Sequence, residues 1–166
     1  MAKLLEHNNW ANQLIIQACA TLSEAQLNAE PPSAAYGNIH NTLTHLVRAQ
    51  QNYLNLLTLP LEDRPKIEIA FKELEESARN SGEALLGLIE RGDPCLEQKH
   101  KTRDGYSVDP WVLLTQIINH ATEHREQIKA ILTALGITPP EIDGWSYGEA
   151  TGGLVPISEE NHDQPG

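Results

Sequence analysis

The clearest periodic pattern of the chain lies between Trp111 and Leu135, where apolar residues recur at the three- and four-residue spacing of an α-helix. The stripe consists of Leu113, Ile117, His120, His124, Ile128, Ile131 and Leu135. Two imidazoles therefore occupy positions that should face a core. Four residues along a helix correspond to about 6 Å of rise and about 40° of rotation, so both rings can reach one point in space. This pair indicates where the chemistry of the chain lies.

Three other segments show the same periodicity and end at residues that stop helices. With the last helix, which opens at Asp109-Pro110, the predicted helices cover about Lys3–Ala20, Asn38–Leu57, Glu68–Ile89 and Pro110–Leu135. Glycine follows the last two of them and favours the backbone turn that ends a helix. Proline-rich segments at residues 28–33 and 58–65 predict loops. No helix is predicted beyond Leu135-Gly136.

Four amphipathic helices must bury their apolar stripes against one another, so we predict an all-α fold, a four-helix bundle. Partial alternation over Lys99–Val108, around Asp104-Gly105, predicts a short β-ribbon before the last helix. Residues 1–150 should form the bundle domain, and residues 151–166 an irregular, mobile C-terminal tail.

The chain is acidic, which limits its partners. Its 166 residues carry 12 Lys and Arg against 23 Asp and Glu, a formal net charge of −11. Binding to nucleic-acid phosphates needs a positive face. The densest basic group, Lys99, Lys101 and Arg103, is flanked by acidic residues in a predicted connection. We therefore expect no nucleic-acid partner.

The sequence shows neither a membrane segment nor an export signal. No apolar run is long enough to cross a bilayer, and the first residues lack the apolar core and cleavage site of a signal peptide. Cys19 and Cys95 show no metal-binding or redox spacing. These features predict a cytoplasmic protein with free thiols and no membrane partner.

A metal site needs a third ligand besides the paired histidines of the last helix. The other histidines are His7, His40, His45, His100 and His162. His40 and His45 both lie on the predicted second helix, and helical spacing does not decide between them. A pair of core histidines that bind backbone or carboxylate groups, without a metal, is the alternative.

Residues 116–128, Gln-Ile-Ile-Asn-His-Ala-Thr-Glu-His-Arg-Glu-Gln-Ile, resemble the fourth-helix signature of the DinB/YfiT-like superfamily of predicted metalloenzymes. Asn9-Trp-Ala-Asn12 resembles an element of its first helix, and Leu43-Thr-His-Leu46 resembles the second-helix motif that contributes a histidine. Asp104-Gly105 and Asp143-Gly-Trp-Ser-Tyr147 are also similar to elements of this group. Together these elements cover most of the first 150 residues.

This resemblance implies a fold and a site. The fold is an up-down-down-up bundle, in which the second and third helices are joined by a crossover. The predicted connection, residues 58–67, can span about 33 Å when extended. The implied site is a divalent metal held by His45, His120 and His124. Zinc is the expected ion, and nickel or another divalent metal also suits three nitrogens.

The implied function is that of a metal-dependent enzyme. A divalent ion on three imidazoles keeps an open position, where it lowers the pKa of bound water or holds a thiol as thiolate. The resemblance implies a hydrolase or a thiol-dependent S-transferase that acts on a small-molecule substrate. The S-transferase would use a low-molecular-weight thiol such as bacillithiol or mycothiol. A homodimer is a family-level expectation. The alternatives are a non-catalytic metal-binding or stress-response protein and a metal-free helical interaction module.

No catalytic residue is assigned beyond the metal site itself. Glu123, Arg125 and Asn12 are candidates to orient the ligands from a second shell. For Glu123 the alternative is a solvent-facing helix charge. For Arg125 the alternative is an ion pair with Glu126 or Asp109.

Overall fold

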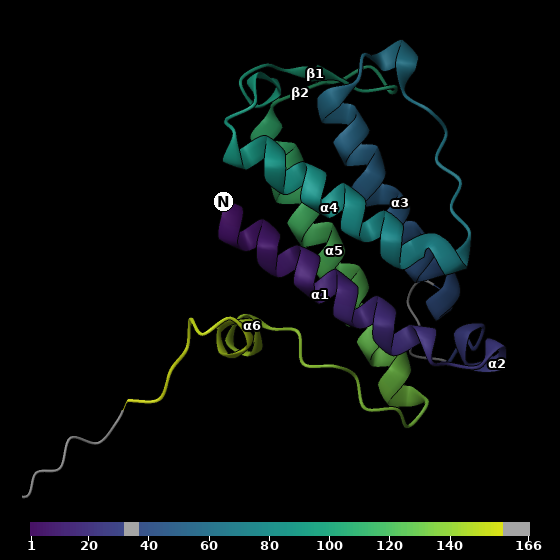
Figure 1. Cartoon of the computed structure of the whole chain (residues 1–166). Coiled ribbons are helices and arrows are strands. Elements are labelled where there is room, and N and C mark those ends of the chain that lie inside the picture. The colour runs from purple at the N-terminus through teal and green to yellow at the C-terminus, as the bar shows by residue number, and fades with distance from the viewer. Residues whose placement is uncertain (32–36, 158–166) are drawn as a thin grey trace, which may run out of the picture.

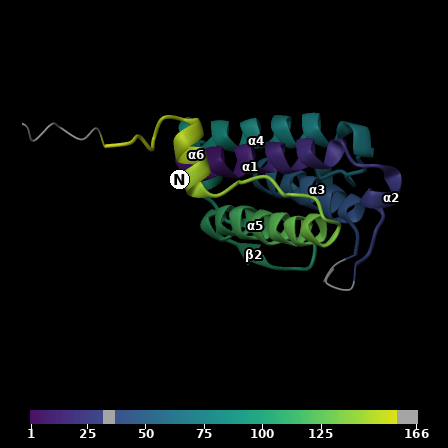
Figure 2. The ribbon, with the colours of Figure 1, turned by 90° about the horizontal axis from the view of Figure 1, so that it is seen from below.

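Four long helices form the molecule in the computed structural model, which describes residues 1–31 and 37–157 (Figure 1). They are α1 (Ala2–Ala20), α3 (Ile39–Thr58), α4 (Leu74–Glu90) and α5 (Pro110–Ala134). Both α1 and α3 pack against α4 and α5, so the order around the bundle is α1, α4, α3, α5 (Figure 2). The predicted all-α four-helix bundle is confirmed. Among the described residues, no helix is long and apolar enough to cross a membrane.

Helices α3 and α4 run in one direction, and α1 and α5 run in the other (Figure 1). The chain between α3 and α4 must therefore return along the length of the bundle. It does so with only two single-turn 3₁₀ helices, η1 (Leu61–Asp63) and η2 (Phe71–Glu73). The predicted start of the third helix, near Glu68, is wrong, because α4 begins at Leu74. Extended backbone covers more distance per residue than a helix does, and the crossover needs these residues extended.

Local sequence explains where the long helices begin and end. The side-chain oxygen of Asn38 accepts a hydrogen bond from the backbone nitrogen of Asn41 at 2.8 Å, which caps the start of α3. Gly92 and Gly136 follow α4 and α5 with φ values of 58° and 74°, a left-handed backbone that glycine adopts without strain. Asp109 precedes α5 as predicted, but its side chain pairs with Lys99 rather than capping the helix.

A layer of polar side chains divides the apolar core into two clusters. One cluster includes Ile15, Leu43, Leu74 and Ile128, and the other includes Leu5, Leu57, Leu85 and Leu113. Between them, each of the four helices contributes buried polar residues: Asn8 and Asn12 (α1), Gln50 (α3), Ser81 (α4) and Arg125 (α5). This polar layer is linked by hydrogen bonds across the bundle.

The shorter elements confirm one prediction and correct another. Strands β1 (His100–Lys101) and β2 (Ser107–Val108) pair antiparallel, as predicted for the ribbon. The chain also forms α2 (Glu24–Leu27), η3 (Pro94–Leu96) and α6 (Gly144–Ala150). Helix α6 contradicts the expectation that no helix follows α5. The side-chain oxygen of Asp143 accepts a hydrogen bond from the backbone of Ser146 at 2.8 Å and starts this helix.

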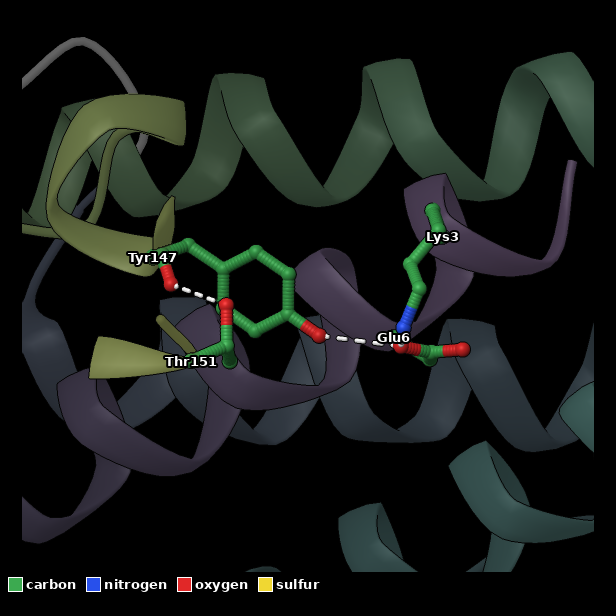
Figure 3. Close-up of polar contacts among 4 residues, drawn as sticks. All are labelled: Lys3, Glu6, Tyr147 and Thr151. Atoms are coloured by element: carbon green, nitrogen blue, oxygen red, sulfur yellow. Dashed lines mark hydrogen bonds and ion pairs between the residues drawn. The ribbon is translucent and has the colours of Figure 1, made fainter. Parts of the chain in front are cut away.

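Helix α6 docks on the N-terminal part of α1 (Figures 1 and 3). The Tyr147 hydroxyl donates to Glu6 at 3.1 Å, and Glu6 also pairs with Lys3 (Figure 3). The rings of Trp10 and Tyr147 lie 5.3 Å apart between centroids. The predicted tail begins within the described residues, but residues 158–166, with His162, lie outside them.

Candidate metal centre

Three imidazoles from two helices converge between α3 and α5. His45 comes from α3, and His120 and His124 come from α5; one nitrogen of each lies within 4.8 Å of the others. The Nε2 atoms of His45 and His120 are 3.1 Å apart. His124 is buried, with 8% of its surface exposed, and His45 is the most exposed of the three. The structure thus brings together the three histidines that the family resemblance selected.

The apolar stripe of α5 sets the direction of its two rings. Ile117 and Ile128 of this stripe are almost completely buried, and they anchor the helix against the core on either side of the histidines. His120 and His124 lie between them, one turn apart, at the edge of the stripe that faces α3. On α3, His45 is followed by the buried Leu46, which fixes that helix against the same core.

The protonation of the rings suits metal binding. Burial lowers the pKa of His45 and His120, and the nearby His124 lowers both further. Both rings are therefore neutral at neutral pH and carry a lone pair. The Nδ1 atom of His124 lies 2.8 Å from Oε1 of Gln127. In the tautomer that carries its proton on Nδ1, His124 donates to this amide oxygen and presents the lone pair of Nε2 for metal binding.

The donor set fits a divalent cation that prefers nitrogen. Two nitrogens bound to one tetrahedral zinc ion at about 2.0–2.1 Å lie about 3.3 Å from each other. The separation of 3.1 Å between His45 and His120 is close to this value. Three imidazoles could hold zinc, nickel or another divalent ion, and they do not discriminate among these metals. That they bind a metal in the protein stays a prediction.

The histidines open into a pocket of about 530 Å³. Apart from the histidines, the lining side chains are polar or charged: Asn41, Thr42, Arg48, Glu123 and Gln127. A volume of this size is typical of small-molecule sites. Sequence reasoning missed Arg48 and Gln127, although both follow a site histidine by three residues and so share its helix face.

The other described histidines are used elsewhere. His40 stacks on Phe71, with ring centroids 4.8 Å apart and planes tilted by 14°. His7 and His100 each place a ring nitrogen near a backbone carbonyl, that of Ile142 at 2.9 Å and that of Cys95 at 2.7 Å. Of the two candidates on the second helix, the structure therefore places His45, and not His40, beside the α5 pair.

The predicted second-shell residues lie in two different places. Glu123 is exposed and lines the pocket. Arg125 and Asn12 belong to the polar layer, where the Arg125 guanidinium donates to the side-chain oxygens of Asn8 at 2.8 Å and Asn12 at 2.6 Å. The alternative for Arg125, an ion pair with Glu126 or Asp109, is wrong, because its guanidinium donates to these neutral amides and the two carboxylates pair with lysines.

Burial also explains the state of Arg125. Its side chain is almost completely buried, with 3% of the residue exposed, and desolvation lowers its pKa to about 10. Its hydrogen-bond acceptors are neutral amides, a backbone carbonyl and the Thr122 hydroxyl. At neutral pH it remains a cation that ties α5 to α1 beside the histidines.

A model of the DinB family matches residues 1–162 of this chain. The chain belongs to the DinB family. It is 26% identical over 162 residues to Protein DinB of Bacillus subtilis (strain 168), covering 87% of this chain and 91% of that protein. Its fold is similar to the crystal structure of a DinB-like protein from Bacillus cereus ATCC 10987, with a TM-score of 0.62, 19% identity, and coverage of 83% of this chain and 92% of that one.

Proposed function

We propose that His45, His120 and His124 bind one divalent metal ion, with zinc as the first candidate, and that this DinB-family protein is a metal-dependent enzyme. The observation that carries the proposal is the convergence of three histidine nitrogens within 4.8 Å, all from residues that line an open pocket. Three neutral nitrogens leave a coordination position for a reactant, which is the arrangement of catalytic rather than structural zinc sites.

The residues of the chain have defined parts in this proposal. The three rings hold the cation, and Gln127 keeps His124 in the tautomer that presents Nε2. The polar lining of the pocket admits a small polar substrate. When bound, a divalent cation in such a site polarises a carbonyl group or lowers the pKa of water or a thiol.

Two reaction types fit this chemistry: hydrolysis, and transfer to or from a low-molecular-weight thiol. In this proposal the nucleophile is not one of the protein's own thiols, because both are buried and protonated at neutral pH. Burial raises the pKa of Cys19 to about 12 and is the main reason why that of Cys95 is raised to about 11. A thiol-dependent reaction therefore needs a thiol from outside the chain.

Metal titration of the purified protein by calorimetry tests the site. We expect one zinc ion per chain, and loss of binding in His120→Ala. His40→Gln is the matched control, because His40 lies on the same helix as His45 but stacks on Phe71 and does not belong to the histidine cluster. If the wild-type protein binds less than a small fraction of one equivalent of zinc or nickel, the proposal is wrong.

Activity is tested with esters, amides and epoxides, each with and without an added thiol. Turnover without thiol supports a hydrolase, and turnover only with thiol supports a transferase. Activity that is unchanged in His124→Ala contradicts metal catalysis. Zinc binding without turnover of any of these substrates favours the alternative of a non-catalytic metal-binding protein. The homodimer that the family resemblance leads us to expect is tested separately by gel filtration, where elution as a monomer would refute it.

A further inference from the structure

The pocket over the histidines carries one positive and one negative side chain on facing helices. Arg48 follows His45 by three residues on α3, and Glu123 follows His120 by three residues on α5. Residues three apart on a helix share a face, so each charge lies above the same opening as its histidine. The remaining non-histidine lining residues, Asn41, Thr42 and Gln127, are neutral.

Each of the two charges lies beside a different histidine. Arg48 and His45 both come from α3, Glu123 and His120 both come from α5, and all four line the pocket. The nearest nitrogens of these two rings are only 3.1 Å apart. The Arg48 guanidinium therefore lies on the α3 side of the histidine cluster, and the Glu123 carboxylate lies on its α5 side.

Neither charge is neutralised by the protein over the described ranges. Ion pairs form at several surface sites, for example between Lys129 and Glu126 on α5, but none of them includes Arg48 or Glu123. The two side chains do not pair with each other across the pocket, and both are exposed. Charged groups held apart in one pocket can each bind a complementary group of a ligand.

We propose that this pocket selects a small zwitterion, whose carboxylate binds Arg48 and whose ammonium group binds Glu123, with the part between them lying over the three histidines. A guanidinium binds a carboxylate through two parallel hydrogen bonds, which gives orientation as well as affinity. The net charge of −11 repels a simple anion at long range, whereas a zwitterion has no net charge. That the bound molecule is a substrate rests on the proposed function.

A matched set of probes tests the charge preference: 4-aminobutyrate, butyrate and butylamine share one four-carbon skeleton. Binding to the metal-free protein is followed by NMR chemical shifts of the pocket residues. We expect 4-aminobutyrate to bind about tenfold more tightly than either single-charge probe, a difference of about 1.4 kcal/mol. Equal binding of the three probes would overturn the proposal.

Neutral variants assign the preference to the two side chains. R48Q should remove the advantage of 4-aminobutyrate over butylamine, and E123Q its advantage over butyrate. R79Q and E83Q are the controls, because they make the same charge changes at exposed positions of α4. Equal losses in the pocket and control variants would show a net-charge effect only and overturn the proposal.

The same titrations on zinc-loaded protein separate this inference from the proposed function. If zinc does not bind but the zwitterion preference holds, the proposed enzyme function fails and the charge selectivity of the pocket stands. If zinc binds but the preference is absent with and without the metal, the metal site stands and the zwitterion inference fails.

Discussion

The substitution Asn12→Ala tests the polar layer that joins the four helices. Asn12 is 1% exposed, accepts a hydrogen bond from Arg125 at 2.6 Å and donates one to Gln50 at 2.9 Å. The bond to the charged guanidinium contributes about 1.5–3 kcal/mol and the neutral one about 0.5–1.5 kcal/mol. We therefore expect the free energy of unfolding to fall by about 2–4 kcal/mol, since alanine leaves two buried polar groups with one partner fewer.

Thermal and urea unfolding, followed by circular dichroism, measure this loss. For a domain of this size, a loss of about 3 kcal/mol lowers the melting temperature by about 6–12 °C. Asn52→Ala is the control, because Asn52 is exposed on α3 and its replacement should change stability by less than about 0.5 kcal/mol. Similar melting temperatures for the two variants would refute the stabilising role of the layer.

A double-mutant cycle locates the interaction within the layer. Gln50→Ala removes the same Asn12–Gln50 bond, together with the bonds of Gln50 to the Ala78 carbonyl and the Ser81 hydroxyl. The combined variant should lose less stability than the two single losses added, by about 0.5–1.5 kcal/mol, because the shared bond is lost only once. Strict additivity would contradict a direct interaction.

Three further predictions concern packing, ligand orientation and pH. In α4, Gly82→Ala places a Cβ 2.6 Å from the Asn9 side chain and should destabilise the protein by about 1–3 kcal/mol in the same unfolding assay. Gly87→Ala meets only the end of a flexible arginine, so it should be neutral or stabilise the protein by up to about 1 kcal/mol. If Gly87→Ala were the less stable of the two variants, the close contact of α1 and α4 would be refuted. Gln127→Leu removes the side-chain oxygen that orients His124, so it should weaken zinc binding by about 10–100-fold in calorimetry. Gln127→Glu keeps an acceptor and should retain zinc binding. If Gln127→Leu bound zinc as tightly as the wild type, Gln127 would have no orienting role. Zinc affinity should fall as the solution is acidified, but at a lower pH than it does for free imidazole, since burial lowers the pKa of His45 and His120 and protons then compete only in more acidic solution; a fall at the same or a higher pH than for free imidazole would contradict it.

Local patterns were enough to predict the four long helices and two of the three site histidines. The 3.6-residue period places His120 and His124 on one face of α5 wherever that helix packs, because their relation is set within one element. Glycine after α4 and α5 marks their ends for the same local reason. The start of α4 was misplaced because the crossover, a property of the topology, keeps the preceding residues extended.

The third histidine depends on how two helices are rotated against each other. Both His40 and His45 lie on α3, and only the packing of α3 on α5 turns His45 toward the pair, while His40 stacks on Phe71. Helical spacing contains no information on that rotation, and the family resemblance supplied the choice.

The environment of Arg125 was also beyond the reach of local patterns. An arginine with acidic neighbours in the sequence is typical of a surface position where it forms an ion pair. The partners of Arg125 are instead Asn8 and Asn12, which lie 117 and 113 residues earlier in the chain. Helix α6 was missed because two glycines in seven residues, Gly144 and Gly148, lower helix propensity, while its contact with α1 is tertiary.

We propose that histidines of α3 and α5 share one metal ion. The most direct test is metal analysis by mass spectrometry after zinc loading and gel filtration, with the wild-type protein beside His45→Ala and His40→Gln. We expect one zinc ion per chain in the wild type and in His40→Gln, and loss of most of the zinc in His45→Ala. Zinc that stays at one equivalent in His45→Ala, or that is absent from the wild type, would show that the three histidines do not form the metal site.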